Sequence, residues 1–180
     1  MDVRTDRLGL LLDQFDTSAE MGRDRLHGLT DEEFLWEPAP GAWSIRQGAA
    51  GRWELQVERP PPDPTPLTTI AWRLAHLQQG FAERWEWTFG AYRDPVVELA
   101  PTAAEGVERL WAELARWRQS LGGLTEEQMD TVGFGRFPHG FDPTLPFIAI
   151  VWWTNRELIH HLAEAALLRD LWPSTPSRSG

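Results

Sequence analysis

Glu157 and His161 are the residues of this sequence whose types and spacing point most directly to chemistry. They lie four positions apart in the segment 155–171, NRELIHHLAEAALLRDL, which contains neither glycine nor proline. Side chains four residues apart project from the same face of a helix. A carboxylate and an imidazole at the edge of a core are costly to bury without a partner. The pair is therefore satisfied either by a mutual hydrogen bond or by a cation.

The apolar residues of the same region place this pair relative to a core. Four of them recur at helical spacing and predict a buried stripe: Val151, Leu158, Leu162 and Ala165. At about 100° per residue, His161 lies beside the stripe and Glu157 lies one step further round. The neighbouring His160 points elsewhere.

A third ligand would complete a metal site, and His76 in AWRLAHLQQG is the favoured candidate. Gly80 follows one helical turn later and would leave space near its ring. Ideal helix geometry nevertheless places His76 more than about 100° from the apolar stripe of its own helix, so an exposed or packing role stays open. His27, at the end of the first helix, and His139, in a loop between Pro138 and Gly140, are weaker candidates.

The ligand types suit a divalent ion. Two imidazoles and one carboxylate can hold such an ion and leave positions open for water or substrate, as in many catalytic zinc sites and non-haem iron centres. The alternative is a hydrogen bond between Glu157 and His161 at a helix edge. Since the sequence has no cysteine, disulfides and a thiol nucleophile from the protein itself are excluded.

Length, composition and charge bound the class of protein. With 180 residues, 42% hydrophobic and 24% charged, we expect one globular domain over residues 1–173 and a disordered tail over 174–180. A net charge of −10 and a pI near 4.9 argue against nucleic acid and anionic membranes as partners. No window approaches the roughly 18 apolar residues of a membrane span, and no signal peptide is evident. We therefore expect a cytoplasmic protein.

Four segments have the apolar spacing of amphipathic helices: about 5–29, 67–90, 102–121 and 147–172. Capping boxes that begin at Thr30 and Thr125 predict a short helix after the first and third of these. The remaining stretches, 38–66 and 133–146, are rich in proline and glycine and predict long connections. Together these patterns predict an all-α fold, a four-helix bundle with two long crossing connections.

Two further groups of residues have open interpretations. Core packing is the favoured role for the eleven tryptophans, and the alternative is that a few of them wall an apolar pocket. Arg46, Arg73 and Arg156 could orient a carboxylated substrate, although ordinary surface charges are the simpler interpretation.

Three segments of the chain resemble the DinB/YfiT superfamily of metal-dependent proteins. They are WEPAPGAWSIRQ (36–47), TTIAWRLAHL (68–77) and ELIHHLAEAALLRDL (157–171). The superfamily includes the mycothiol-dependent maleylpyruvate isomerase and the bacillithiol transferases. The resemblance implies a four-helix bundle and places His76 at the position of the second-helix metal ligand.

The final helix departs from the commonest pattern of that family. Many members carry His-x-x-x-His there, whereas this chain has Glu157 at the first of these positions and His161 at the second. It is similar to the His–Glu–His variant of thiol-dependent isomerase relatives. The resemblance therefore implies that His76, Glu157 and His161 converge on one ion, usually zinc or nickel, and that the protein forms a homodimer.

These observations lead to two functional hypotheses of different classes. The first is a metal-dependent enzyme that activates a low-molecular-weight thiol, such as mycothiol or bacillithiol, or water, for transfer, isomerisation or hydrolysis of a small molecule. The second is a non-catalytic, dimeric helical stress or ligand-binding protein without a functional metal site. Catalytic and substrate-binding residues are not identified by the sequence.

Overall fold

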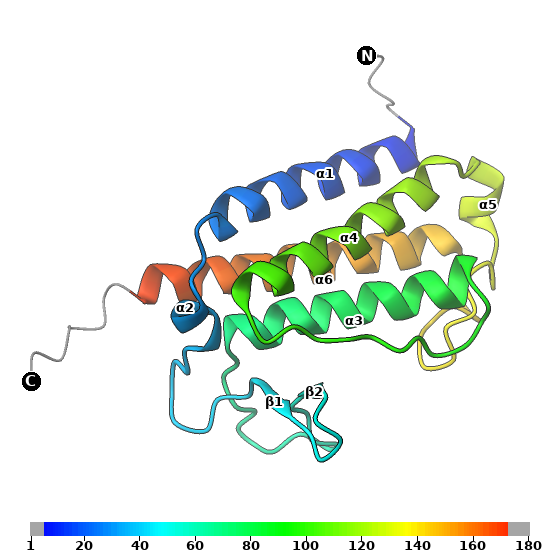
Figure 1. Ribbon diagram of the computed structural model, residues 1–180. Helices are drawn as coiled ribbons and strands as arrows, with labels where there is room; N and C mark the ends of the chain where they lie inside the picture. Colours follow the sequence, from blue (N-terminus) through cyan, green and yellow to red (C-terminus); the bar gives the residue numbers. More distant parts are fainter. Residues whose placement is uncertain (1–5, 173–180) are drawn as a thin grey trace, which may run out of the picture.

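Four long helices form the body of the computed structural model, which describes residues 6–172 (Figure 1). They are α1 (Arg7–Leu26), α3 (Ile70–Phe89), α4 (Ala103–Gly122) and α6 (Phe147–Leu171). Helix α3 packs against α4 and α6, and α1 packs against the same two helices from the other side. The predicted all-α four-helix bundle is confirmed. The predicted disordered tail, 174–180, lies outside the described residues.

Two short helices follow long ones, as the capping boxes predicted. Helix α2 (Asp31–Leu35) begins after Thr30 and α5 (Glu126–Asp130) begins after Thr125. In both, the threonine hydroxyl accepts a hydrogen bond from the third residue of the helix, whose side chain in turn accepts one from the backbone of the threonine. Each box satisfies donors that a helix N-terminus otherwise leaves unpaired.

The connections between the long helices differ in path. Segment 90–102 runs back along the length of the bundle, so that α3 and α4 point in the same direction (Figure 1). The two long predicted connections, 38–66 and 133–146, lie at opposite ends of the bundle (Figure 1). The first of them therefore lies at the end of the bundle where α3 begins.

A short hairpin that the sequence patterns did not predict lies in the first connection. Strands β1 (Ile45–Gln47) and β2 (Trp53–Leu55) pair antiparallel. Each has three residues, which is too short to show an alternating apolar pattern. The backbone of Trp43 exchanges hydrogen bonds with Leu67 and Thr69. These bonds join the residues just before the hairpin to the segment that leads into α3.

The apolar stripe predicted in the last helix is buried, with Val151, Leu158 and Ala165 at 0% exposure. Helix α3 is buried over a wider arc than its predicted stripe, because Ala71, Ala75 and Ala82 are also buried. This wider arc follows from its contacts with α4, α6 and the hairpin together.

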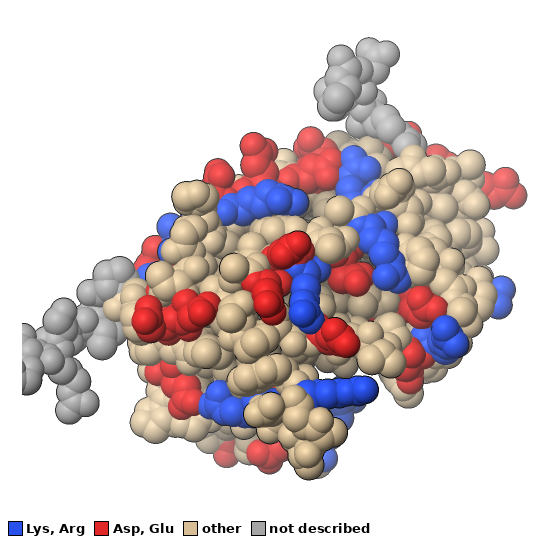
Figure 2. All heavy atoms as spheres, viewed as in Figure 1, with Lys and Arg blue, Asp and Glu red and all other residues tan. Residues whose placement is uncertain are grey.

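Charged side chains of both signs are interspersed on the face that shows α1 and α4, and this face carries no extended basic patch (Figure 2). Within residues 6–172, every helix is too short or too polar to cross a bilayer.

Candidate metal centre

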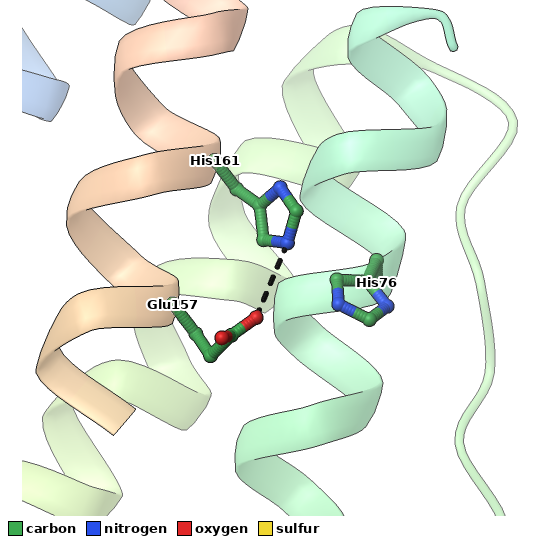
Figure 3. Close-up of side chains that lie close together, drawn as sticks. All are labelled: His76, Glu157 and His161. Atoms are coloured by element: carbon green, nitrogen blue, oxygen red, sulfur yellow. Dashed lines mark ion pairs between the residues drawn. The ribbon is translucent and has the colours of Figure 1, made fainter. Parts of the chain in front are cut away.

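Side chains of His76, Glu157 and His161 meet between α3 and α6 (Figure 3). One potential ligand atom from each lies within 4.8 Å of the others. The Nε2 atom of His161 is 3.5 Å from Oε2 of Glu157, and the ring centroids of His76 and His161 are 4.7 Å apart at an interplanar angle of 83°. Two nitrogens and one carboxylate oxygen thus face a common space. The residues predicted as a ligand set are brought together by the fold.

The position of His76 depends on the first connection as well as on α3. Its ring stacks on the indole of Trp72, with a centroid distance of 4.9 Å and an interplanar angle of 12°. The Trp72 indole nitrogen donates a hydrogen bond to the backbone oxygen of Gln56, and the ring stacks on Trp43. His76 is half-buried, so the exposed role that ideal helix geometry left open does not apply.

The second nitrogen of His161 faces a different set of partners. Its Nδ1 lies 2.9 Å from Oε2 of Glu164 and 3.1 Å from Nη1 of Arg73, and these two residues form an ion pair at 2.8 Å. Arginine can only donate hydrogen bonds. If Glu164 accepts from both Arg73 and the Nδ1–H of His161, the lone pair on Nε2 is left facing Glu157 and His76. A carboxylate that orients a ligand histidine in this way is common in metal sites.

Both histidines are kept neutral by their surroundings. Burial lowers the pKa of His76 to about 4, and the nearby His161 adds to the effect. Burial likewise lowers the pKa of His161, while its hydrogen bond to Glu164 opposes the shift. A histidine binds metal through a neutral ring nitrogen. At neutral pH these two imidazoles therefore need not lose a proton before they bind an ion.

A second group of potential ligands shares His161 with the first and includes His160 and Glu164. It is less suited to a cation for two reasons. The Nδ1 atom of His161 is already occupied by Glu164, and the guanidinium of Arg73 lies beside both atoms. A divalent ion there would face a fixed positive charge. The first group is therefore the better site.

The other candidates from the sequence lie elsewhere. His27 and His139 are exposed and belong to neither group, and Arg46 pairs with Glu37 away from the site. Of the three arginines considered for substrate binding, the remaining two do reach the site. Arg73 pairs with Glu164, and Arg156 lies 3.0 Å from Glu157.

Sequence reasoning missed the contributions of Arg73 and Glu164. Glu164 lies three residues after His161, which is a spacing that brings side chains together on a helix. That spacing alone could have suggested Glu164 as a partner. The part of Arg73 depends on the packing of α3 against α6, which no local spacing reveals.

A comparison with protein families agrees with this geometry. The profile of the DinB superfamily matches residues 54–165. The chain belongs to the DinB superfamily. The matched segment contains all three residues of the candidate centre, the whole of α3 and most of α6, which continues beyond the match to Leu171. Searches of curated proteins and of solved structures give no match.

Proposed function

We propose that this DinB-superfamily protein is an enzyme that depends on one divalent ion, with His76, Glu157 and His161 as ligands. The observation that carries the proposal is the convergence of three ligand atoms from two helices within 4.8 Å. Two imidazoles and a carboxylate leave coordination positions open for a reacting molecule. Zinc and nickel are the ions that the family resemblance favours.

Thiol or water activation is the chemistry proposed for this site. A bound divalent ion would lower the pKa of a coordinated thiol or water and thus supply a nucleophile at neutral pH. Because the chain lacks cysteine, the thiol would have to come from a cosubstrate, such as mycothiol or bacillithiol. Transfer, isomerisation and hydrolysis are all compatible with this nucleophile.

The residues of the chain hold and orient the reacting groups. By accepting a hydrogen bond from Nδ1–H, Glu164 would fix the tautomer of His161. Trp72 covers one face of the His76 ring. Arg156 lies beside Glu157 with its side chain 55% exposed, so it can reach a substrate carboxylate next to the ligands. Each of these contacts restricts the orientation of a ligand or a substrate before the reaction begins.

Metal analysis of protein purified without a histidine tag tests the proposal. We expect about one zinc or nickel ion per chain, and loss of that ion in His76→Ala. His139→Ala, which removes an exposed histidine outside the site, is the matched control and should keep the ion. Absence of any ion in the wild type after incubation with zinc and nickel would support the alternative of a non-catalytic helical protein.

Thiol consumption tests the chemistry separately. With ion-loaded protein, mycothiol or bacillithiol and an electrophile, we expect faster loss of the thiol than with His76→Ala. An ion-loaded protein that accelerates no thiol reaction but hydrolyses a substrate would assign water as the nucleophile.

The expected homodimer is supported by exposed apolar side chains on neighbouring parts of α1 and α6. Met21, Trp152 and Ile159 are 64%, 54% and 39% exposed. Ile159 lines one shallow depression with Met21 and another with Trp152, so these residues form one continuous apolar face. Sedimentation of the wild type and of Trp152→Ser tests this proposal, because the substitution should shift the mass toward the monomer.

A further inference from the structure

A groove of about 680 Å³ opens directly beside the candidate metal centre. It lies between α3, the hairpin and the segment that leads into α4. His76 lines it, so the same side chain belongs to the ligand set and to the groove wall. A molecule that reaches the ion with one end can therefore lie in this groove with the other.

Gly80 borders open space in the groove. This residue follows His76 by one turn of α3 and lines the groove, and a Cβ atom added there would meet no atom within 4 Å. The walls are aromatic and aliphatic, with Trp43, Trp53 and Trp72 among them. Such a space fits a flat or ring-shaped group.

The charged groups that line the groove are mostly acidic. Three carboxylates, Glu54, Glu58 and Glu83, against one guanidinium, Arg59, leave a net charge of −2. Within residues 6–172 none of these four groups forms an ion pair with another residue. Glu83 is half-buried and is held by a hydrogen bond of 2.9 Å from Nε2 of Gln79. The carboxylates therefore remain available to a ligand.

We propose that the groove binds the cationic part of a substrate, an amine or quaternary ammonium attached to a ring. Indole faces attract cations, and nearby carboxylates add to that attraction. Because the ring of Trp72 stacks on both His76 and Trp43, the indole face for the cation comes from Trp43 or Trp53. The same carboxylates repel a ligand that carries a carboxylate at this end. The proposed substrate thus has two chemically different ends. One end carries an atom that donates an electron pair to the ion, and the other carries a positive charge and lies in the groove. The assignment of the donor end rests on the proposed function, and the assignment of the groove does not.

Three para-substituted aromatic thiols of similar size test the charge preference. They are 4-(aminomethyl)thiophenol, 4-(hydroxymethyl)thiophenol and 4-mercaptobenzoate, which are positive, neutral and negative at the far end. Titrated calorimetrically into zinc-loaded protein, the cationic thiol should bind about tenfold more tightly than the anionic one. Equal affinities, or the opposite order, would overturn the proposal.

Two variants with matched controls locate the effect. Glu83→Gln should narrow the difference in affinity between the cationic and anionic thiols, whereas Glu108→Gln, at an exposed position of α4, should leave that difference unchanged.

Gly80→Phe should fill the groove and lower the affinity for all three thiols about tenfold without loss of zinc. Ala104→Phe is the matched control for Gly80→Phe, because it adds the same ring at an exposed position of α4, away from the groove. Unchanged binding in Gly80→Phe would place the thiols outside the groove.

A probe without a thiol separates this proposal from the metal proposal. Benzyltrimethylammonium should quench the tryptophan fluorescence of metal-free protein, and Gly80→Phe should abolish the saturable part of the quenching. If zinc fails to bind but this quenching is observed, the proposed function fails and the groove assignment stands. If zinc binds and the quenching is absent, the groove assignment fails.

Discussion

Helix α3 contributes to two polar clusters, two turns apart, and they are built in opposite ways. At one, Arg84 pairs with Asp142 of the connection 133–146, and their side chains are only 5% and 0% exposed. At the other, His76 meets Glu157 and His161 of α6 beside an open groove. The first has one positive and one negative charge in contact. The second has neutral imidazoles and a carboxylate, with ring nitrogens facing a shared space.

The packing around Arg84 and Asp142, the closed cluster, shows how an ion pair is shielded from solvent. The guanidinium of Arg84 lies 4.3 Å from the ring centroid of Phe137 and 4.8 Å from that of Trp153. A side chain at Gly135 would collide with Asp142, and one at Gly140 would collide with Arg84. Glycines thus let the loop close over the pair. The histidine cluster instead lies beside the open groove. The covered ion pair therefore has no room for a ligand, whereas the histidine cluster can be reached by one.

The largest expected effect comes from breaking the closed cluster. Asp142→Ala leaves the buried charge of Arg84 without a partner, which costs about 3–5 kcal/mol of unfolding free energy. His76→Ala in metal-free protein should cost only roughly 1 kcal/mol. Urea denaturation of both variants measures the difference.

A double variant checks the cause of that loss. Arg84→Met combined with Asp142→Leu removes both charges and should recover much of the stability, because apolar residues of similar volume can replace a buried ion pair. If Asp142→Ala stays within about 1 kcal/mol of the wild type, the pair does not hold the loop as described.

Zinc should stabilise the folded protein only through the histidine cluster of His76, Glu157 and His161. With free zinc at 100 times its dissociation constant, the wild type should gain about 2.7 kcal/mol. His161→Ala should gain nothing, since Nε2 of this ring is one of the proposed ligand atoms. Thermal unfolding with zinc and with chelator measures the gain, and an equal gain in both proteins would place the zinc elsewhere.

Removal of Glu164 should lower the affinity for the ion, although Glu164 is not itself one of the proposed ligands. In Glu164→Ala, Arg73 is free to donate to Nδ1 of His161, which places the ring proton on Nε2 and opposes metal binding. We expect a 10- to 100-fold loss of zinc affinity in a competition titration with a chromophoric chelator. His160→Ala is the control, because His160 also contacts Glu164 but does not belong to the first ligand group. A similar loss in His160→Ala would favour the second ligand group.

The smallest effect should be a pH dependence of the metal-free protein. Because burial lowers the pKa of His76 from its usual 6.5 to about 4, the unfolded chain binds the proton at a higher pH than the folded one. Acidification from pH 6.5 to pH 4 should therefore lower stability, and above pH 6.5 this contribution should be constant. His76→Gln should flatten the profile in urea denaturation, and His139→Gln should not. A profile that is the same in His76→Gln and the wild type would contradict the neutral, desolvated state of His76.

The bundle and the relative placement of two of the three candidate ligands could be predicted from local patterns. Glu157 and His161 share one helix, so their relative position follows from helix geometry alone. His76 lies on another helix and required the packing of α3 against α6. Apolar spacing placed it far from the stripe of α3, because that stripe described only one of the buried sides of this helix. The family resemblance, and not the periodicity, predicted that His76 lies beside Glu157 and His161.

The closed cluster escaped prediction for the same physical reason. Arg84 and Asp142 are 58 residues apart, and nothing in the spacing of either indicates a partner. The hairpin also escaped, since strands of three residues carry too little pattern. The ion pair thus depends on a contact between segments distant in the sequence, whereas the hairpin is local and its strands are only too short to be recognised.

The groove wall and the candidate metal ligands belong to different kinds of secondary structure. His76, Glu157 and His161 stand on long, regular helices, whereas much of the groove wall comes from residues 53–61 of the first connection. Exchanging that connection for another would alter which molecules the groove admits and leave the three candidate metal ligands in place. Descendants of this chain can thus acquire new selectivity by varying one surface loop.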